Sequence, residues 1–210
     1  MFALSPDAPP ALPFWIDGRA VLSLGERLVD VQNPRQEPVL RRVPVCGAAV
    51  AQRAVAAACA AQPAWAALDP ALRQGVLAAL ATALAGYAPH FARLLGEDAG
   101  LTATAAAEDV ARAEQALLAL PAQAPLSPVC ALLPAADDPA PFSDAVRRLA
   151  MALNAGSAVL LLSSPCVAAP LLALAELAAR SGVPAGVFNL VHGDAMSARA
   201  LQAAIGDSAG

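Results

Sequence analysis

The stretch PAGVFNLVHG (Pro184–Gly193) decides the fold of this chain. A proline and a glycine precede a short apolar run and a second glycine ends it, which is typical of a buried strand between two turns. Upstream, ALNAGSAVLLL (Ala152–Leu162) reads as a helix end, a glycine turn and another buried strand. Strand, helix and strand in this order form the unit of a parallel nucleotide-binding sheet. The two stretches therefore predict an α/β fold with a parallel, Rossmann-like sheet.

The second half of the chain continues this alternation in both directions. We predict strands at 129–133, 158–162 and 187–191, and helices at 142–154, 167–181 and 195–204, the last of them short. Together they form a partial nucleotide-binding βαβαβ unit over residues 129–210, with at least three parallel strands and helices on both faces. The Pro-rich segment 121–128 is predicted as a linker to the preceding part.

The first half predicts a β-hairpin and a helical layer over residues 14–120, after a flexible Pro/Ala-rich arm at 1–13. Asp17-Gly18 lies between apolar runs and favours a type I′ turn, because both residues tolerate positive φ angles. Two further strands are predicted at 28–31 and 39–45, on either side of a turn at Asn33-Pro34. We expect residues 14–210 to form one domain.

Local signals also predict where the helices of the first half begin. Helical spacing starts near residue 47, Asp69 before Pro70 can cap a second helix, and Thr102 can cap a later one. Gly86 and Pro89 are expected to break the helix between these caps. The residues predicted to face the core are Leu72, Val76, Leu80, Leu84, Phe91, Leu94, Leu95, Val110, Ala113, Leu117 and Leu120.

The composition excludes several classes of function. All thirteen basic residues are arginine, so Schiff-base and P-loop lysines are absent from this sequence. The net charge is −4 and the arginines are scattered, so we expect no nucleic-acid partner. Hydrophobic residues make up 58% of the chain and charged residues 14%, which indicates a folded globular protein.

The four cysteines, Cys46, Cys59, Cys130 and Cys166, show no C-x-x-C spacing and no neighbouring histidine. We interpret them as small buried hydrophobic residues in a reducing cytoplasm, and expect no metal site. The run 149–175 has no charged residue and is long enough to cross a bilayer. Serines and prolines interrupt it, so the strand–helix interpretation is favoured over membrane insertion.

Several short motifs lie along the chain, at Phe14–Gly18, Asp30–Pro34, Pro63–Trp65, Arg73–Leu77, Asp98–Leu101 and Pro184–Gly193. Through these motifs the sequence resembles the aldehyde dehydrogenase family from residue 14 to about 205. The stretch at Pro184–Gly193 fits the family pattern P-x-G-V-x-N-x-V-x-G. The resemblance implies descent from an NAD(P)-dependent oxidoreductase that acts on aldehydes, and a complete family member is far longer than this chain.

The resemblance also implies a catalytic scheme whose residues are not found here. In the family, a cysteine thiolate attacks the aldehyde, hydride passes to a nicotinamide, and a glutamate activates the water that releases the acid. These residues lie well beyond the position of Gly193, so we predict no catalytic residue in this sequence and no activity of the chain alone. The family's W-N-x-P element places its proline on Pro141, and Asp138 and Pro139 replace the Trp-Asn pair that carries the oxyanion donor.

The family's cofactor-binding tetrad K-P-S-E falls on residues 162–165. Leu162 and Pro165 replace the lysine and glutamate that address the ribose hydroxyls, and Ser164 is retained. By family position alone, Ser164 and Gly193 are the candidate cofactor-binding residues. The implied cofactor is NAD or NADP, and we expect these replacements to weaken its binding.

Several single residues could suggest a functional site, but each also has a simpler structural interpretation. His192 follows a predicted strand, where ligands gather in α/β folds, and we favour a turn residue. His90 is expected on the surface, and Asp137-Asp138 in a solvated loop rather than at a metal. Asp194 is predicted to cap the last helix, and Trp15 and Trp65 to anchor packing.

Three functions remain open. The chain is a truncated or split family member that is inert alone, a catalytically dead module that binds a family partner or forms a homo-oligomer, or a small-molecule-binding α/β domain. Strand 187–191 is expected to leave an unpaired edge, although family topology could place another strand beside it, and hairpin 14–21 is expected to lack sheet partners. Both edges favour association with another chain.

Overall fold

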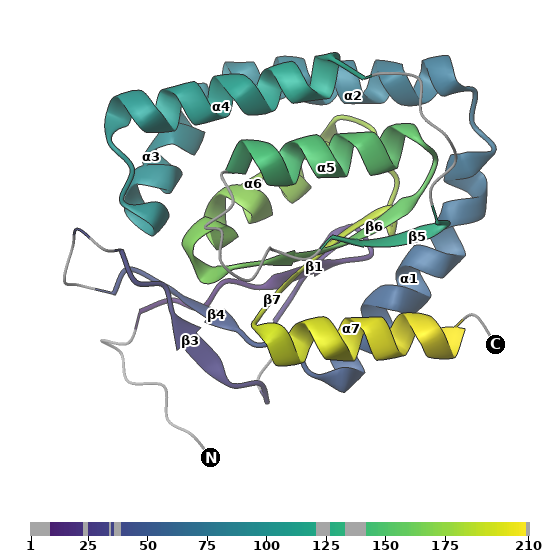
Figure 1. Cartoon of the computed structure of the whole chain (residues 1–210), viewed down its shortest axis with the longest axis horizontal. Coiled ribbons are helices and arrows are strands. Elements are labelled where there is room, and N and C mark those ends of the chain that lie inside the picture. Colours follow the sequence, from purple (N-terminus) through teal and green to yellow (C-terminus); the bar gives the residue numbers. More distant parts are fainter. Residues whose placement is uncertain are drawn as a thin grey trace.

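A five-stranded sheet forms the centre of the molecule (Figure 1). The structure is a computed structural model that describes residues 9–22, 25–33, 35, 39–120, 127–132 and 142–208. The strand order is β2-β1-β7-β6-β5. The strands are β1 (Phe14–Ile16), β2 (Arg19–Val21), β5 (Val129–Leu132), β6 (Ala158–Ser163) and β7 (Phe188–His192). Strands β5, β6 and β7 run parallel, which confirms the predicted sheet.

The N-terminal hairpin completes this sheet, so the hairpin does not lack sheet partners, and of the two alternatives for strand 187–191 the one with a neighbouring strand is confirmed. Strand β1 pairs antiparallel with β7, with Trp15 opposite Leu190. The β1–β2 turn is fixed to the same strand, because the Asp17 backbone N–H donates to Asn189 Oδ1 at 3.0 Å. Strand β7 is thus an interior strand and hairpin 14–21 has a sheet partner. Within the part of the chain that is described, the edge strands are β2 and β5.

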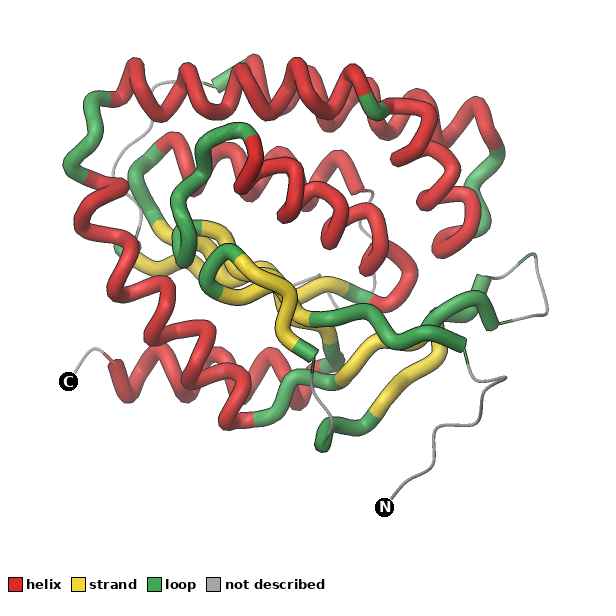
Figure 2. The backbone as a smooth tube through the Cα atoms, turned by 180° about the vertical axis from the view of Figure 1, so that it is seen from behind, coloured by secondary structure: helices red, strands yellow, loops and turns green. Residues whose placement is uncertain are grey.

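Helices cover both faces of the sheet (Figures 1 and 2). One face carries α5 (Phe142–Asn154) and α6 (Ala168–Arg180), which follows the short helix η1 (Pro165–Val167). The opposite face carries α1 (Ala48–Ala66) and α7 (Ala195–Ser208), and α7 is longer than predicted. An outer layer of α2 (Pro70–Gly86), α3 (Ala88–Ala99) and α4 (Ala103–Leu118) lies over α5 and α6.

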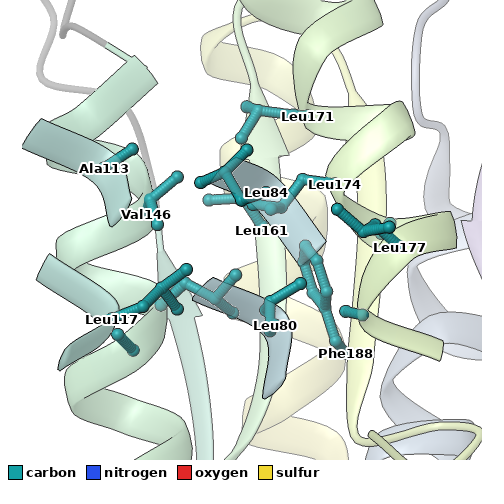
Figure 3. Close-up of a cluster of buried hydrophobic side chains, with 14 of the residues drawn as sticks. Leu80, Leu84, Ala113, Leu117, Val146, Leu161, Leu171, Leu174, Leu177 and Phe188 are labelled. Atoms are coloured by element: carbon teal, nitrogen blue, oxygen red, sulfur yellow. The ribbon is translucent and has the colours of Figure 1, made fainter. Parts of the chain in front are cut away.

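The core divides along the pleat of the strands, because successive side chains point to opposite faces. Leu161 and Phe188 join the cluster beneath α2, α4, α5 and α6 (Figure 3). Leu160 and Leu162 join the cluster on the face of α1 and α7. Trp65 is buried and its Nε1–H donates to the Leu153 carbonyl oxygen at 2.9 Å, which confirms it as a packing anchor.

The predicted inward face of α2 is wrong at its first turn. Leu72 is 59% exposed, whereas Leu80 and Leu84 are buried as predicted. Arg73 takes the buried position instead, because its guanidinium donates to the carbonyl oxygens of Asn154 and Leu68 at 3.1 and 2.5 Å. An arginine can be buried when its donors are satisfied in this way.

The predicted helix starts are confirmed. The Asp69 carboxylate accepts the Ala71 N–H at 2.8 Å, and the Thr102 hydroxyl accepts the Ala105 N–H at 3.3 Å. Helices α2 and α3 meet at a bend of 74°, near the predicted break. By length and composition these two could cross a membrane only as a bent pair, and among the described helices none could do so singly.

A second, two-stranded sheet lies beside the main one. It pairs β3 (Leu28–Asp30) with β4 (Arg42–Pro44), so the strand predicted at 39–45 is shorter than expected. Predictions that fall on the start of the arm, on most of the linker and on Asp137, Asp138, Pro139 and Pro141 lie outside the described residues.

Candidate functional site

The carboxyl ends of β6 and β7 form the edge of the sheet at which ligands gather in α/β folds. Ser163 and His192 lie opposite each other in the parallel register, and each ends its strand. Ser164 and Pro165 follow one strand, and Gly193 follows the other. The structure therefore brings both candidate cofactor-binding residues, Ser164 and Gly193, to the same edge.

His192 is a buried strand residue, so its interpretation as a turn residue is wrong. The side chain is 0% exposed and stacks on Phe14, with ring centroids 5.7 Å apart. Its Nε2 lies 3.0 Å from the Pro13 carbonyl oxygen, which can only accept, so Nε2 carries the proton. Nδ1 therefore accepts the hydroxyl proton of Ser163 across 2.6 Å. Burial lowers the pKa of His192 to about 4, so the ring is neutral at physiological pH.

The turn after β7 is shaped for close packing. A Cβ at Gly193 would overlap the side chain of Ser197 in the first turn of α7, so only glycine fits there. Asp194 accepts the N–H groups of Met196 and Ser197 at 2.9 and 3.2 Å, which confirms the predicted cap. Its carboxylate also pairs with Arg27 at 2.7 Å. The positive end of α7 is therefore already neutralised by a side chain of this protein.

The tetrad at residues 162–165 does not fit a ribose-binding role. Leu162 is 3% exposed, belongs to the cluster under α1 and α7, and has no polar side-chain atom. Pro165 opens η1 and has no side-chain donor or acceptor. Ser164 keeps a hydroxyl, which lies 3.2 Å from Cys166 Sγ. The residues present therefore do not fit NAD or NADP at two of the positions that the family resemblance implies.

The four cysteines differ in burial, contrary to the prediction. Only Cys46 is buried, whereas Cys59 is exposed and Cys130 and Cys166 are half-buried, so the interpretation of all four as buried hydrophobic residues is wrong. Burial, with a smaller effect from Glu26, raises the pKa of the Cys46 thiol to about 12. That thiol is protonated at neutral pH and is a poor nucleophile. Across the described ranges, no three metal-binding side chains cluster together.

His90 is exposed, as predicted, with its ring nitrogen 3.3 Å from the Arg93 guanidinium. Trp15 is half-buried against the core cluster beneath α6. Neither residue lies at the carboxyl edge.

A buried ion-pair network beside this edge was not predicted. Arg41 pairs with Glu97 at 2.6 Å and with Asp98, whose side chain is 1% exposed. Asp98 also accepts the Ala169 N–H at the start of α6, at 3.0 Å. Burial raises the pKa of Asp98 to about 6 against the opposing effect of these partners. The sequence signals for this network are the adjacent acids at 97–98 and the adjacent arginines at 41–42. The paired residues are more than fifty positions apart, so a local pattern does not reveal their pairing.

Comparison with known proteins agrees with this architecture. The model of the aldehyde dehydrogenase family matches residues 21–128 and 139–205. The chain is 29% identical to the rat mitochondrial acylating methylmalonate-semialdehyde/malonate-semialdehyde dehydrogenase, over 91% of this chain and 39% of that protein. It is also 29% identical to the lactaldehyde dehydrogenase of Escherichia coli K12, over 88% of this chain and 43% of that protein.

A solved structure shows the same fold. The putative methylmalonate-semialdehyde dehydrogenase of Sinorhizobium meliloti 1021, complexed with NAD, superposes with a TM-score of 0.81 at 25% identity. The match covers 92% of this chain and 43% of that one. The fold and the family match define a protein of the aldehyde dehydrogenase class. This chain belongs to the aldehyde dehydrogenase family, and it spans about two fifths of the length of these relatives.

Proposed function

We propose that this chain is a cofactor-domain module of an aldehyde dehydrogenase-family protein, derived from an NAD(P)-dependent oxidoreductase, and that it oxidises no aldehyde by itself. The observation that carries the proposal is the pair of replacements at the end of β6. Leu162 is buried in the core and Pro165 has no polar side-chain group, where the family resemblance implies a lysine and a glutamate. A cofactor bound here would lack both charge-assisted hydrogen bonds to its ribose.

The state of the thiols supports the same proposal. Aldehyde oxidation of the family type needs a thiolate beside donors that hold an oxyanion. Cys46 is buried with its pKa raised, and its thiol donates to the Gly47 carbonyl oxygen at 3.6 Å, a group that cannot stabilise an anion. Cys166 contacts Ser164 rather than a base.

We further propose that the module works joined to other aldehyde dehydrogenase-family sequence, as a homo-oligomer or with a full-length homologue. Strand β5 supports this role, because among the described strands it pairs with β6 alone, and its four residues are all apolar and half-buried. Helices α5 and α1 contact β5 from the two faces of the sheet. An apolar edge between covered faces favours pairing with another strand.

An activity assay tests the first part of the proposal. The purified chain, offered lactaldehyde or methylmalonate semialdehyde with NAD or NADP, should form reduced cofactor no faster than the uncatalysed reaction. Steady formation of reduced cofactor contradicts the proposal. A rate that survives replacement of all four cysteines by serine would show a mechanism without a thiol, and a rate lost only in Cys166→Ser would identify a nucleophile.

A further inference from the structure

A groove outside the carboxyl edge lies between the β1–β2 turn and helix α1, and its volume is about 470 Å³. Asp17 and Arg19 line it from the hairpin, and Arg53, Ala57, Ala60 and Ala61 line it from α1. The turn that precedes β7 adds Ala185. The groove therefore opens at the amino end of the parallel strands, opposite the edge that carries Ser164 and Gly193. Its volume falls within the range of about 300–1,000 Å³ that is typical of small-molecule sites.

One glycine and one buried amide fix the walls of this groove. Gly186 has a φ of +80°, and a Cβ there would lie 2.7 Å from the Ala57 carbonyl oxygen and 2.9 Å from the Ala61 Cβ. Asn189, which is 0% exposed, donates to the Gly186 carbonyl oxygen at 2.6 Å and accepts the Asp17 N–H at 3.0 Å. One buried side chain thus holds both the hairpin turn and the turn before β7, which are two of the walls of the groove.

The charges around the groove are unbalanced. Arg53 is the one charged residue of α1, and among the residues described here no carboxylate pairs with it. Within the described part of the chain, Arg19 pairs only with Asp17, at 3.4 Å, and both side chains are about half exposed or more. Such an exposed pair contributes little and can open without a large cost. Two arginines and one aspartate therefore line the groove, together with the alanines of α1.

We propose that this groove binds a small organic anion. Its carboxylate or phosphate group contacts Arg53 and Arg19, and its apolar part lies on Ala57, Ala60 and Ala61. Guanidinium groups bind both kinds of oxyanion through paired N–H donors, which explains the use of arginine at this site. The proposal is independent of the cofactor edge, and loss of NAD binding does not affect it.

Amide NMR spectra of the full chain test the proposal with benzoate and phenyl phosphate as probes. We expect saturable shifts of Asp17, Gly18 and Ala61, and stronger binding for whichever probe matches the natural oxyanion. In Arg53→Gln the affinity should fall about tenfold or more, because one charge-assisted contact is lost. Arg199→Gln, which removes an exposed arginine of α7 from outside the groove, is the matched control and should leave the affinity unchanged.

A second variant keeps the test independent of Arg53. Ala60→Glu places a carboxylate in the groove on an exposed helix position that tolerates glutamate, so it should abolish binding and leave the circular dichroism spectrum unchanged. Three results overturn the proposal. The first is that inorganic phosphate binds as tightly as the two probes, and the second is that neutral benzyl alcohol does so. The third is that Arg199→Gln loses as much affinity as Arg53→Gln.

Discussion

Ser163 and His192 join the carboxyl ends of two parallel strands through a buried hydrogen bond of 2.6 Å. The same imidazole donates to the Pro13 carbonyl oxygen at 3.0 Å, immediately before β1. The pair has the chemistry of a serine–histidine dyad, but both side chains are almost fully buried, so no substrate reaches them. Their role is to fix the N-terminal hairpin to the sheet.

This arrangement predicts a stability loss in mild acid. The pKa of His192 is about 4 in the folded chain, below its ordinary value of 6.5, so between these values the unfolded state binds the extra proton. The contribution of this group is therefore present above pH 6.5 and falls as the pH drops towards 4, by about 1.5 kcal/mol between pH 6.5 and 5. Urea unfolding of the wild type and His192→Gln at both pH values should show a smaller decline in the variant.

His90→Gln is the control for that experiment. His90 is exposed, so its replacement should leave the acid-dependent decline unchanged. An equal decline in the wild type and His192→Gln would show that protonation of His192 does not cause the loss of stability, and would contradict its lowered pKa.

The buried network around Asp98 predicts a second effect on stability. Arg41→Leu removes the cation beside a carboxylate that is 1% exposed, and such a loss typically costs about 3–5 kcal/mol. Because the pKa of Asp98 is raised to about 6, the cost should be smaller at pH 5, where the carboxyl group is largely protonated, than at pH 8. Chemical denaturation at both pH values measures this difference.

Arg93→Leu provides the comparison for Arg41→Leu. Arg93 pairs with Glu97, and its side chain is 56% exposed, so its loss should cost less than about 1 kcal/mol. Equal costs for the two variants would contradict the importance of the buried carboxylate.

The cysteines should differ in their rates of labelling by a thiol reagent. Cys59 is exposed on α1, and Cys46 is buried with a pKa of about 12, so a disulfide reagent at pH 8 should modify Cys59 first and Cys46 last. Mass spectrometry of partially labelled chain identifies the order. Fast labelling of Cys46 in the folded chain would disagree with its burial.

The edge of β5 predicts self-association. The four residues Val129–Leu132 carry no charge, whereas β2 carries Arg19 on the opposite edge. Light scattering at tens of micromolar should detect oligomers, and Ala131→Lys should reduce them because a charged edge disfavours strand pairing. Ala20→Lys on β2 should have little effect. A monodisperse wild-type monomer at this concentration would contradict the prediction.

The sequence predicts the features that depend on neighbouring residues better than those that depend on contacts between distant segments. The caps at Asp69 and Thr102 depend on neighbouring residues and were correct. The pairing of Trp15 with Leu190 joins segments that are distant in sequence, and no short motif specifies it, so local patterns alone do not decide whether β7 is an edge strand. The prediction of a turn residue at His192 is wrong for the same reason, because its partners Pro13 and Phe14 are distant in sequence.

The most direct test of the proposed function is a calorimetric titration of the purified chain with NAD. Each charge-assisted hydrogen bond lost at Leu162 and Pro165 typically contributes about 1.5–3 kcal/mol, so each loss weakens binding by about tenfold or more. We predict no saturable heat at submillimolar NAD, and no rescue by Leu162→Lys alone, because Pro165 still supplies no acceptor. A micromolar dissociation constant for the wild-type chain would contradict the account.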